Sequence, residues 1–244
     1  MREWRYFGAS VRGPAHAQDG QQNQDAWLGR ANRNVTLVAV CDGMGSRAHA
    51  DFGARAACLA VADAARCWAQ AEGAPPELLL RAVHALWNIR VHSVGREECA
   101  TTCLFAVASP DGRLVLAQLG DGLVAMLKTS GEFVTLEPSG DRFSNQTTGL
   151  GVATSLADWR LYAEPMLEPR TTILLATDGI SEDLKPTRRS EFVAHLRNDL
   201  GSMPAAMRWR RLTRELRNWP VPHHRDDKTL ALLWRGASAI GETT

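Results

Sequence analysis

The chain has 244 residues, 45% hydrophobic and 23% charged, and its 28 basic and 27 acidic side chains leave a formal net charge of +1. This composition is typical of a globular protein, predicts one domain over residues 1–244, and argues against nonspecific binding to nucleic acid. No apolar run approaches the roughly 18 residues of a transmembrane helix, and the N-terminus lacks the apolar core of a signal peptide, so we expect a cytoplasmic protein with no membrane partner.

The N-terminal part of the chain predicts strands followed by two helices. Residues 4–11 are aromatic-rich and strand-like, residues 12–24 predict a loop, and residues 35–41 form an apolar run typical of a strand buried on both faces. Residues 49–71 have apolar side chains at helical intervals, and Pro75-Pro76-Glu77 begins a second helix. We expect both helices to bury their apolar faces in a core.

The rest of the chain returns to strands and ends with helices and one more strand. Residues 100–136 contain four short strands with Gly-containing turns, which predicts a meander of antiparallel hairpins. Residues 138–160 are polar and lack periodicity, which predicts a long loop. A buried strand is expected over 171–177, helices over 188–219 and a last strand over 229–234. This order predicts an α+β fold with helices outside sheets.

The five cysteines predict no disulfide or metal site. Their number is odd, each lies in an apolar or Ala-rich stretch, and no neighbouring histidine completes a zinc site. We therefore expect reduced, buried thiols at Cys41, Cys58, Cys67, Cys99 and Cys103.

Carboxylates lie at the ends of the predicted buried strands. Asp42-Gly43 and Asp178-Gly179 each follow an apolar strand, Asp226-Asp227 precedes the last strand, and Asp25 lies beside a short apolar run. Grouped carboxylates repel one another unless they take up protons or bind a cation. Because Mg²⁺ and Mn²⁺ prefer oxygen ligands, the pattern indicates a divalent metal site if the strand ends converge.

Two other interpretations of these residues stay open. Asp-Gly is a common turn dipeptide, and this is the simpler interpretation at Asp19-Gly20 and Asp111-Gly112. Gly43-x-Gly45-x-x-Ala48, between a strand and a helix, fits a loose dinucleotide-binding fingerprint. Asp42, directly before that fingerprint, would repel a pyrophosphate.

Taken in order, six motifs resemble the metal-dependent protein phosphatase family of the 2C type, in its bacterial form. They are Asn23-Gln24-Asp25-Ala26, Val40-Cys41-Asp42-Gly43-Met44-Gly45, Thr101-Thr102, Gly120-Asp121-Gly122, Thr177-Asp178-Gly179-Ile180 and Asp226-Asp227-Lys228-Thr229. The resemblance implies a two-layer antiparallel β-sandwich flanked by helices on both sides. It also implies a protein-serine/threonine phosphatase of bacterial signalling.

The resemblance further implies a binuclear centre with two Mn²⁺ or Mg²⁺ ions per chain. Asp42 would bridge both ions, and Gly43 would lend its carbonyl to one of them. Asp178 and Asp226 would hold the other ion, and Asp25 would bind a metal or its waters. A further ligand, Asp121, would help to hold a third ion. A water or hydroxide bridging the two ions would hydrolyse phosphoserine or phosphothreonine, and Asp42 and Asp178 would act in catalysis through that water.

Some positions depart from the family pattern. Gln24 stands where many relatives have a glutamate ligand, and Asp227 stands where asparagine is common. Met44 leaves the general acid unassigned, with candidates at His16, His49, His223 and His224. His16 and Arg47 are the candidates for binding substrate.

Two functions follow as hypotheses. The first is a phosphatase that acts on a phosphorylated protein, with a cognate bacterial Ser/Thr kinase as a partner, and that works as a monomer. The alternative is a catalytically weak or inactive member of the family that binds phosphoproteins as a regulatory module. A Mn²⁺-dependent phosphopeptide assay that compares the wild type with Asp42→Ala and Asp178→Ala distinguishes the two, because no turnover at all would favour the binding module.

The region 208–217 predicts an Arg-rich helix. Trp209, Leu212, Leu216 and Trp219 form an apolar stripe, and a different face carries the arginines Arg210, Arg214 and Arg217. This pattern is typical of a surface helix docked by its apolar side. A docking surface for an acidic protein or a phosphopeptide is the alternative.

Overall fold

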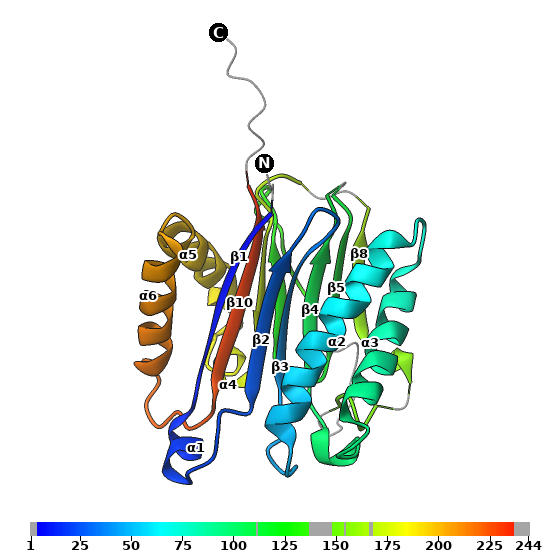
Figure 1. Ribbon diagram of the computed structural model, residues 1–244. Helices are drawn as coiled ribbons and strands as arrows, with labels where there is room; N and C mark the ends of the chain where they lie inside the picture. Colours follow the sequence, from blue (N-terminus) through cyan, green and yellow to red (C-terminus); the bar gives the residue numbers. More distant parts are fainter. Residues whose placement is uncertain (1–3, 111, 137–147, 154, 166–167, 237–244) are drawn as a thin grey trace.

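A computed structural model describes residues 4–110, 112–136, 148–153, 155–165 and 168–236 (Figure 1). Within these ranges, ten strands form two five-stranded antiparallel sheets. One sheet has the order β1 (Trp4–Val11), β10 (Lys228–Arg235), β9 (Thr172–Ala176), β6 (Leu123–Leu127) and β7 (Phe133–Thr135). The other has the order β2 (Asp25–Ala31), β3 (Thr36–Asp42), β4 (Cys103–Ala108), β5 (Leu114–Leu119) and β8 (Arg160–Glu164).

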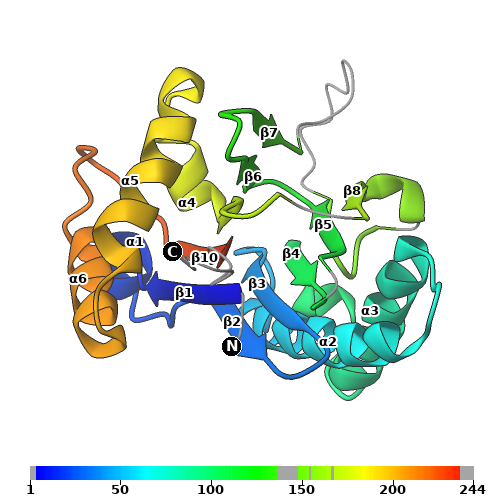
Figure 2. The same ribbon diagram turned by 90° about the horizontal axis from the view of Figure 1, so that it is seen from above.

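The two sheets stack face to face, and long helices cover both outer faces (Figures 1 and 2). The β2-to-β8 sheet is covered by α2 (Ala50–Gln70) and α3 (Pro76–Val91), and the β1-to-β7 sheet by α5 (Arg189–Gly201) and α6 (Ala205–Arg217). Short helices occupy the connections, namely α1 (Pro14–Gln18), α4 (Asp178–Ser181), η1 (Glu97–Cys99), η2 (Leu156–Asp158) and η3 (Pro186–Arg188). The predicted α+β sandwich with helices on both sides is confirmed.

Strand β3 shows why the sandwich needs continuous apolar runs. Its side chains alternate between two cores, because successive residues of a strand point to opposite faces. Val38 and Val40 pack between the sheets, whereas Leu37, Ala39 and Cys41 pack beneath α2 and α3. A third core lies between the other sheet and helices α5 and α6.

Several expectations about the elements are corrected. The strands of residues 100–136 are not one meander, because β5 belongs to one sheet and β6 to the other, and the Gly120–Gly122 turn carries the chain across. Strand β8 is an addition that begins within the predicted loop 138–160, and residues 138–147 and 154 of that loop lie outside the described residues. The helical stretch 188–219 is broken at Ser202–Pro204 into α5 and α6.

Two side-chain expectations are also wrong. Cys67 is exposed, whereas the other four cysteines are buried, and all five are free thiols. Trp209 is 56% exposed and leaves the apolar stripe of α6, whose buried members are Leu212 and Leu216. None of the helices in the described part of the chain is long and apolar enough to cross a membrane.

Candidate metal centre

The last residue of β3, Asp42, is held at the end of the sandwich by two threonines. The Asp42 N–H donates to Thr102 Oγ1 at 2.9 Å, and Thr101 Oγ1 donates to the Asp42 carbonyl oxygen at 2.8 Å. The following residue, Gly43, packs so tightly that an added Cβ would lie 2.5 Å from the carbonyl oxygen of Ala50. Glycine at this position therefore lets the chain turn into the loop before α2 without moving the helix.

Asp25, the first residue of β2, lies directly opposite Asp42 in the antiparallel register of β2 and β3. The Asp25 side chain is buried, and its Oδ2 accepts a hydrogen bond from Thr177 Oγ1 at 2.9 Å. Its other oxygen, Oδ1, is buried and has no hydrogen-bond partner among the residues that the structure describes. A carboxylate oxygen left without a donor in this way is the arrangement that a cation or a proton would satisfy.

Asp178 and Asp226 reach the same end of the sandwich from the other sheet. Asp178 is the first residue of α4, separated from β9 by Thr177 alone, and its Oδ1 accepts a hydrogen bond from the Gly179 N–H at 2.7 Å. Asp226 precedes β10, and its Oδ1 accepts from the Asp227 N–H at 2.8 Å. A Cβ on Gly179 would overlap the Asp227 carbonyl oxygen, so the two turns pack backbone against backbone.

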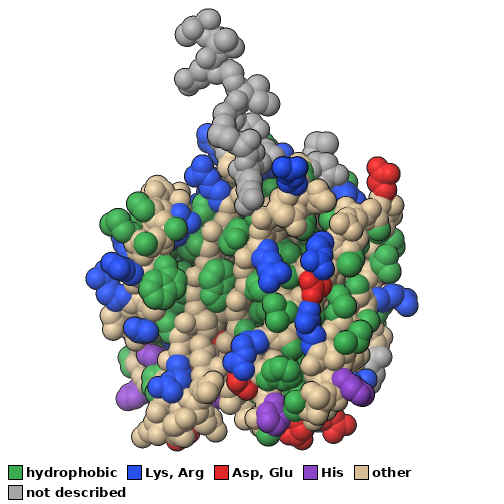
Figure 3. Space-filling model, viewed as in Figure 1, with side chains coloured by type: hydrophobic (Ala, Val, Ile, Leu, Met, Phe, Trp, Pro, Cys, Tyr) green, Lys and Arg blue, Asp and Glu red, His purple; other side chains and the backbone are tan. Residues whose placement is uncertain are grey.

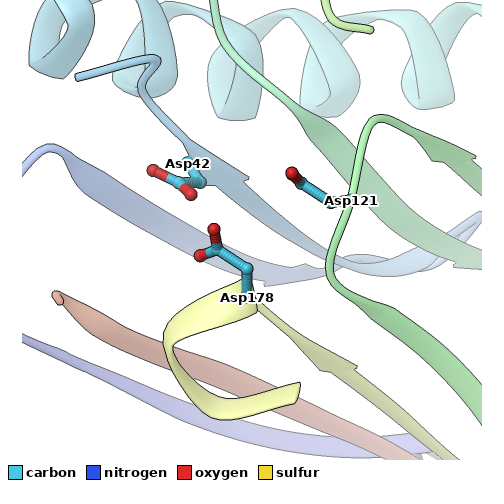
Figure 4. A group of neighbouring side chains, drawn as sticks. All are labelled: Asp42, Asp121 and Asp178. Carbon is cyan, nitrogen blue, oxygen red and sulfur yellow. The ribbon is translucent and has the colours of Figure 1, made fainter. Parts of the chain in front are cut away.

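Three carboxylates from three separate segments converge at this end of the fold (Figure 4). Asp42, Asp121 and Asp178 each present one oxygen, and these oxygens all lie within 4.8 Å of one another. In Figure 4 the carboxylates of Asp42 and Asp178 point toward each other from β3 and α4, and Asp121 extends from the Gly120–Gly122 turn. All three line a cleft of about 540 Å³ together with Asp226.

The structure therefore brings together most of the predicted ligands. Asp42, Gly43, Asp121, Asp178 and Asp226 all line the cleft. The exception is Asp25, which lies beside Asp42 on the neighbouring strand and is not part of the cleft wall.

Crowding and burial make the charged forms of these acids unfavourable. Burial raises the pKa of Asp25 to about 7, with a further contribution from the charge of Asp227. The pKa of Asp42 lies well above its usual range, first because of burial and then because of the charges of Asp25 and Asp178. Burial and the charge of Asp226 raise the pKa of Asp178 to about 6. Acids perturbed in this way, in a cleft, indicate a functional site.

These residues fit a divalent metal ion. The donor set consists of carboxylate oxygens and a backbone carbonyl, which suits Mg²⁺ and Mn²⁺ rather than a soft metal. The unpartnered Asp25 Oδ1 and the raised pKa values both indicate negative charge that the protein leaves without enough counterions. A bound cation would remove this repulsion and return the carboxylates to their charged forms.

Asp227 organises the N-terminal loop beside the centre. It is 2% exposed, and its Oδ1 accepts from the Gly13 N–H at 2.6 Å while its Oδ2 accepts from the Gln24 N–H at 2.7 Å. The imidazole Nδ1 of His16 lies 2.9 Å from Asp227 Oδ2. Asp227 thus supports both α1, which carries His16, and the segment before β2, which carries Gln24, and both residues line the cleft.

Of the sequence candidates for binding substrate or donating a proton, His16 and Arg47 line the cleft. His49, the residue before α2, and His223 are exposed, and none of His49, His223 and His224 is among the residues that line the cleft. In Figure 3 the visible histidines lie toward the lower edge, the end of the molecule that carries α1 in Figure 1.

Sequence reasoning missed two residues that support the centre. Thr177 bonds to Asp25, and Lys228 donates from Nζ to the carbonyl oxygen of Gly179 at 2.8 Å. Lys228 is 2% exposed, and burial lowers its pKa while nearby carboxylates oppose that change. The only signal in the sequence was a lysine in an otherwise apolar strand, directly after Asp226-Asp227.

Solved structures with the same fold include those of RsbX, PstP and PppA. RsbX in complex with magnesium is 14% identical, with a TM-score of 0.63 over 97% of this chain and 97% of that chain. The catalytic domain of the serine/threonine phosphatase PstP with two manganese ions is 21% identical, with a TM-score of 0.61 over 96% of this chain and 98% of that chain. PppA of Pseudomonas aeruginosa is 19% identical, with a TM-score of 0.62 over 96% of this chain and 98% of that chain.

At these identities the structural likeness shows the fold, and the family comes from the sequence comparison. A comparison with curated protein sequences gives no match. A sequence model of the protein phosphatase 2C family matches residues 12–219, which include every one of the converging acids except Asp226. Family and fold together indicate a metal-dependent phosphatase, and the chain belongs to the protein phosphatase 2C family.

Proposed function

We propose that the chain is a protein-serine/threonine phosphatase that hydrolyses phosphoserine and phosphothreonine with two Mn²⁺ or Mg²⁺ ions. The observation that carries this proposal is the convergence of Asp42, Asp121 and Asp178 within 4.8 Å, from segments far apart in the chain. The PstP structure, which contains two manganese ions, supports the choice of metal and of reaction. We further propose that residues 1–244 act as one domain, as a monomer in the cytoplasm.

Each acid has a proposed role in holding the ions. Asp42 would contact both ions and the Gly43 carbonyl one of them. Asp178 and Asp226 would hold the other ion, and Asp121 would help to hold a third. Asp25 would bind a metal or its waters from the strand beside Asp42, through the oxygen that has no partner among the described residues. When bound, the ions would supply Lewis-acid activation of water and neutralise charge on the phosphoryl oxygens.

The cleft offers groups of the kind that bind a phosphorylated side chain. Arg47 lines it, and the buried Arg47 Nε has no hydrogen-bond partner within the described part of the chain, so a phosphate oxygen could satisfy it. His16 lines the same cleft from α1, and the Asp227 carboxylate lies 2.9 Å from its imidazole Nδ1 and holds the ring in place. These residues would position the substrate phosphate over the acids.

The shape of the surface favours a peptide over a small phosphate ester. A second cleft of about 600 Å³ adjoins the first, and the two share Gln24, Gly45, Ser46 and Arg47 in their walls. We infer that the two clefts open into one another through these shared walls and act as one groove. Such a groove can hold residues on one side of a phosphorylated serine or threonine, which supports a protein substrate.

The experiment compares hydrolysis of phosphoserine and phosphothreonine peptides by the wild type and by Asp42→Ala and Asp178→Ala, with Mn²⁺ and with EDTA. We expect turnover by the wild type with Mn²⁺ alone, and none by either variant. Turnover in EDTA, or turnover that survives both substitutions, would refute the metal-dependent mechanism.

A second function is favoured by one observation. Gln24 places a carboxamide in the wall of the cleft, where a glutamate would supply a charged ligand. A weakly loaded centre would leave a phosphoprotein-binding module of low activity. Saturable binding of a phosphopeptide without turnover, in Mn²⁺, would favour this function, and a gain of turnover in Gln24→Glu would identify Gln24 as the cause.

A further inference from the structure

A buried lysine lies under the acidic centre and outside the cleft. Lys228, the first residue of β10, is 2% exposed, and its Nζ donates to the Gly179 carbonyl oxygen at 2.8 Å. The Nζ also lies 5.8 Å from the centre of the Trp219 ring. Four carboxylates interact electrostatically with this ammonium group, namely those of Asp183, Asp226, Asp25 and Asp178.

The position of Lys228 links two segments that carry acids of the centre. The hydrogen bond joins β10, which follows Asp226, to the residue directly after Asp178. The same two segments are already in backbone contact, because a Cβ on Gly179 would overlap the Asp227 carbonyl oxygen. The Lys228 hydrogen bond therefore stabilises the backbone contact between Gly179 and Asp227, and this contact sets the positions of Asp178 and Asp226 relative to each other.

Burial of a lysine is costly, and this one has a specific compensation. An ammonium group removed from water loses several kcal/mol of solvation unless charges and hydrogen bonds replace it. Here the replacement comes from one carbonyl, one indole face and the acids of the centre. Because Lys228 does not line the cleft, it cannot reach substrate and would act as a positioning residue.

We propose that Lys228 is a built-in cation of the centre. It offsets part of the acidic charge and holds the Asp178–Gly179 turn before divalent ions bind, and its charge then opposes theirs. This inference rests on the proposed function, since it requires that the centre binds divalent ions. It predicts a coupling between the Lys228 charge and metal occupancy that a merely structural lysine would not have.

Two substitutions separate the charge from the hydrogen bond. Lys228→Met removes both, whereas Lys228→Gln removes the charge and keeps an N–H donor for Gly179. The matched control is Lys128→Met, because the Lys128 side chain is also mostly buried, 12% exposed, and pairs with Glu132 and Glu164. Lys128 directly follows β6, whereas Asp121 of the centre precedes that strand, so the control lies at the end of β6 away from the centre. Melting temperatures are measured in EDTA and in saturating Mn²⁺, and the Mn²⁺ dissociation constant by calorimetry at low ionic strength.

We expect both Lys228 variants to lower the melting temperature more in EDTA than in Mn²⁺. We also expect both to bind Mn²⁺ more tightly, by roughly three- to tenfold at low salt, since a nearby positive charge has been removed. Lys128→Met should lower both melting temperatures equally and leave Mn²⁺ affinity unchanged. Lys228→Gln keeps the test valid if Lys228→Met does not fold.

Three results would count against the proposal. Equal losses of melting temperature in EDTA and Mn²⁺, with unchanged Mn²⁺ affinity, would show a merely structural lysine. Weaker Mn²⁺ binding by Lys228→Gln would show that the charge does not oppose the metal. A wild-type protein that binds no Mn²⁺ would overturn the proposed function itself, and with it the coupling, so the two failures are distinguishable.

Discussion

Asp25 and Asp42 face each other as register partners in the antiparallel pair of β2 and β3, at the end of a buried sheet. Like charges directly opposite in such a pair destabilise it. The structure accommodates them with raised pKa values, about 7 for Asp25 and well above the usual range for Asp42. The sandwich therefore holds two acids together in an arrangement that protons or cations must relieve, and this has measurable consequences.

The first consequence is an unusual pH dependence of the metal-free protein. The pKa of Asp25 is raised from 3.8 to about 7, and that of Asp178 from 3.8 to about 6. From about pH 4 up to these raised pKa values, the folded chain therefore binds more protons than the unfolded chain. The free energy of unfolding then falls as pH rises. Since one pKa unit corresponds to about 1.4 kcal/mol, we expect the melting temperature in EDTA to fall by at least about 3 °C from about pH 5 to 7.5.

The control for this prediction is Asp25→Asn, which carries no titrating group at the position. Its melting temperature in EDTA should fall less steeply over the same pH range than that of the wild type. With saturating Mn²⁺ the wild-type decrease should also vanish, because a bound cation stabilises the charged acids. A wild-type melting temperature that rises with pH in EDTA would contradict the prediction.

A second consequence concerns Asp42→Asn, which keeps the size of the side chain and removes its charge. We expect phosphopeptide turnover in Mn²⁺ to fall by on the order of 10²- to 10³-fold, the range found when one electrostatic stabiliser is removed. In EDTA at neutral pH the variant should melt higher than the wild type, because repulsion with Asp25 and Asp178 is relieved. Calorimetric scans in EDTA and initial rates in Mn²⁺ measure the two effects, and a variant less stable than the wild type in EDTA would contradict this account.

Much of the centre could be predicted because strand ends are marked in the sequence. Each of Asp42 and Asp178 follows a run of apolar residues that is buried on both faces, and such runs identify strands without knowledge of their neighbours. The resemblance to a known family then supplied the arrangement of two stacked sheets, but not which strands pair within them. Asp121 came from the resemblance alone, since a Gly-Asp-Gly turn looks the same within a hairpin and between sheets.

The remaining features depend on contacts between distant segments. Nothing in the local sequence distinguishes β5 and β6 as partners from β5 and β6 as members of different sheets, because both are almost wholly buried. Lys228 was missed because its partner, the Gly179 carbonyl, is a backbone group 49 positions away. Trp209 was misplaced because helical periodicity locates a stripe but not its edge, and Trp209 lies at that edge.

Asp227 offers a third prediction, on the stability of the N-terminal loop. Its carboxylate accepts from the backbone N–H groups of Gly13 and Gln24, so Asp227→Ala leaves two donors without partners. Each such donor costs about 1–3 kcal/mol where it is buried. We expect a clear loss in the free energy of unfolding in urea, and a smaller loss for Asp227→Asn, which retains one acceptor oxygen. Equal stability of Asp227→Ala and wild type would contradict the structure of this loop.

Arg47 offers a fourth prediction, on substrate binding. Arg47 lines both clefts, so Arg47→Met should raise the KM for a phosphopeptide by about tenfold, which corresponds to about 1.4 kcal/mol of lost binding. The kcat should change less, because the acids remain in place. The control is Arg66→Met on the surface of α2, where the side chain is 60% exposed and pairs with Asp63. A lower kcat with unchanged KM would show that Arg47 does not bind the ground-state phosphate.

The last prediction concerns Gly179. Comparison of Gly179→Ala with a matched glycine variant outside the cleft distinguishes a loss of packing from a loss of metal binding. A Cβ on Gly179 would overlap the Asp227 carbonyl oxygen, and a Cβ on Gly53 in α2 would overlap the Cys99 carbonyl oxygen. Both Gly179→Ala and Gly53→Ala should therefore create the same kind of clash. Overpacking of this kind typically lowers the free energy of unfolding by about 1–3 kcal/mol, so both variants should melt at a lower temperature. Only Gly179→Ala pushes the Asp178 turn away from Asp226, so only this variant should weaken Mn²⁺ binding in calorimetry. If both variants bound Mn²⁺ as the wild type does, the contact between the two turns would not set the geometry of the centre.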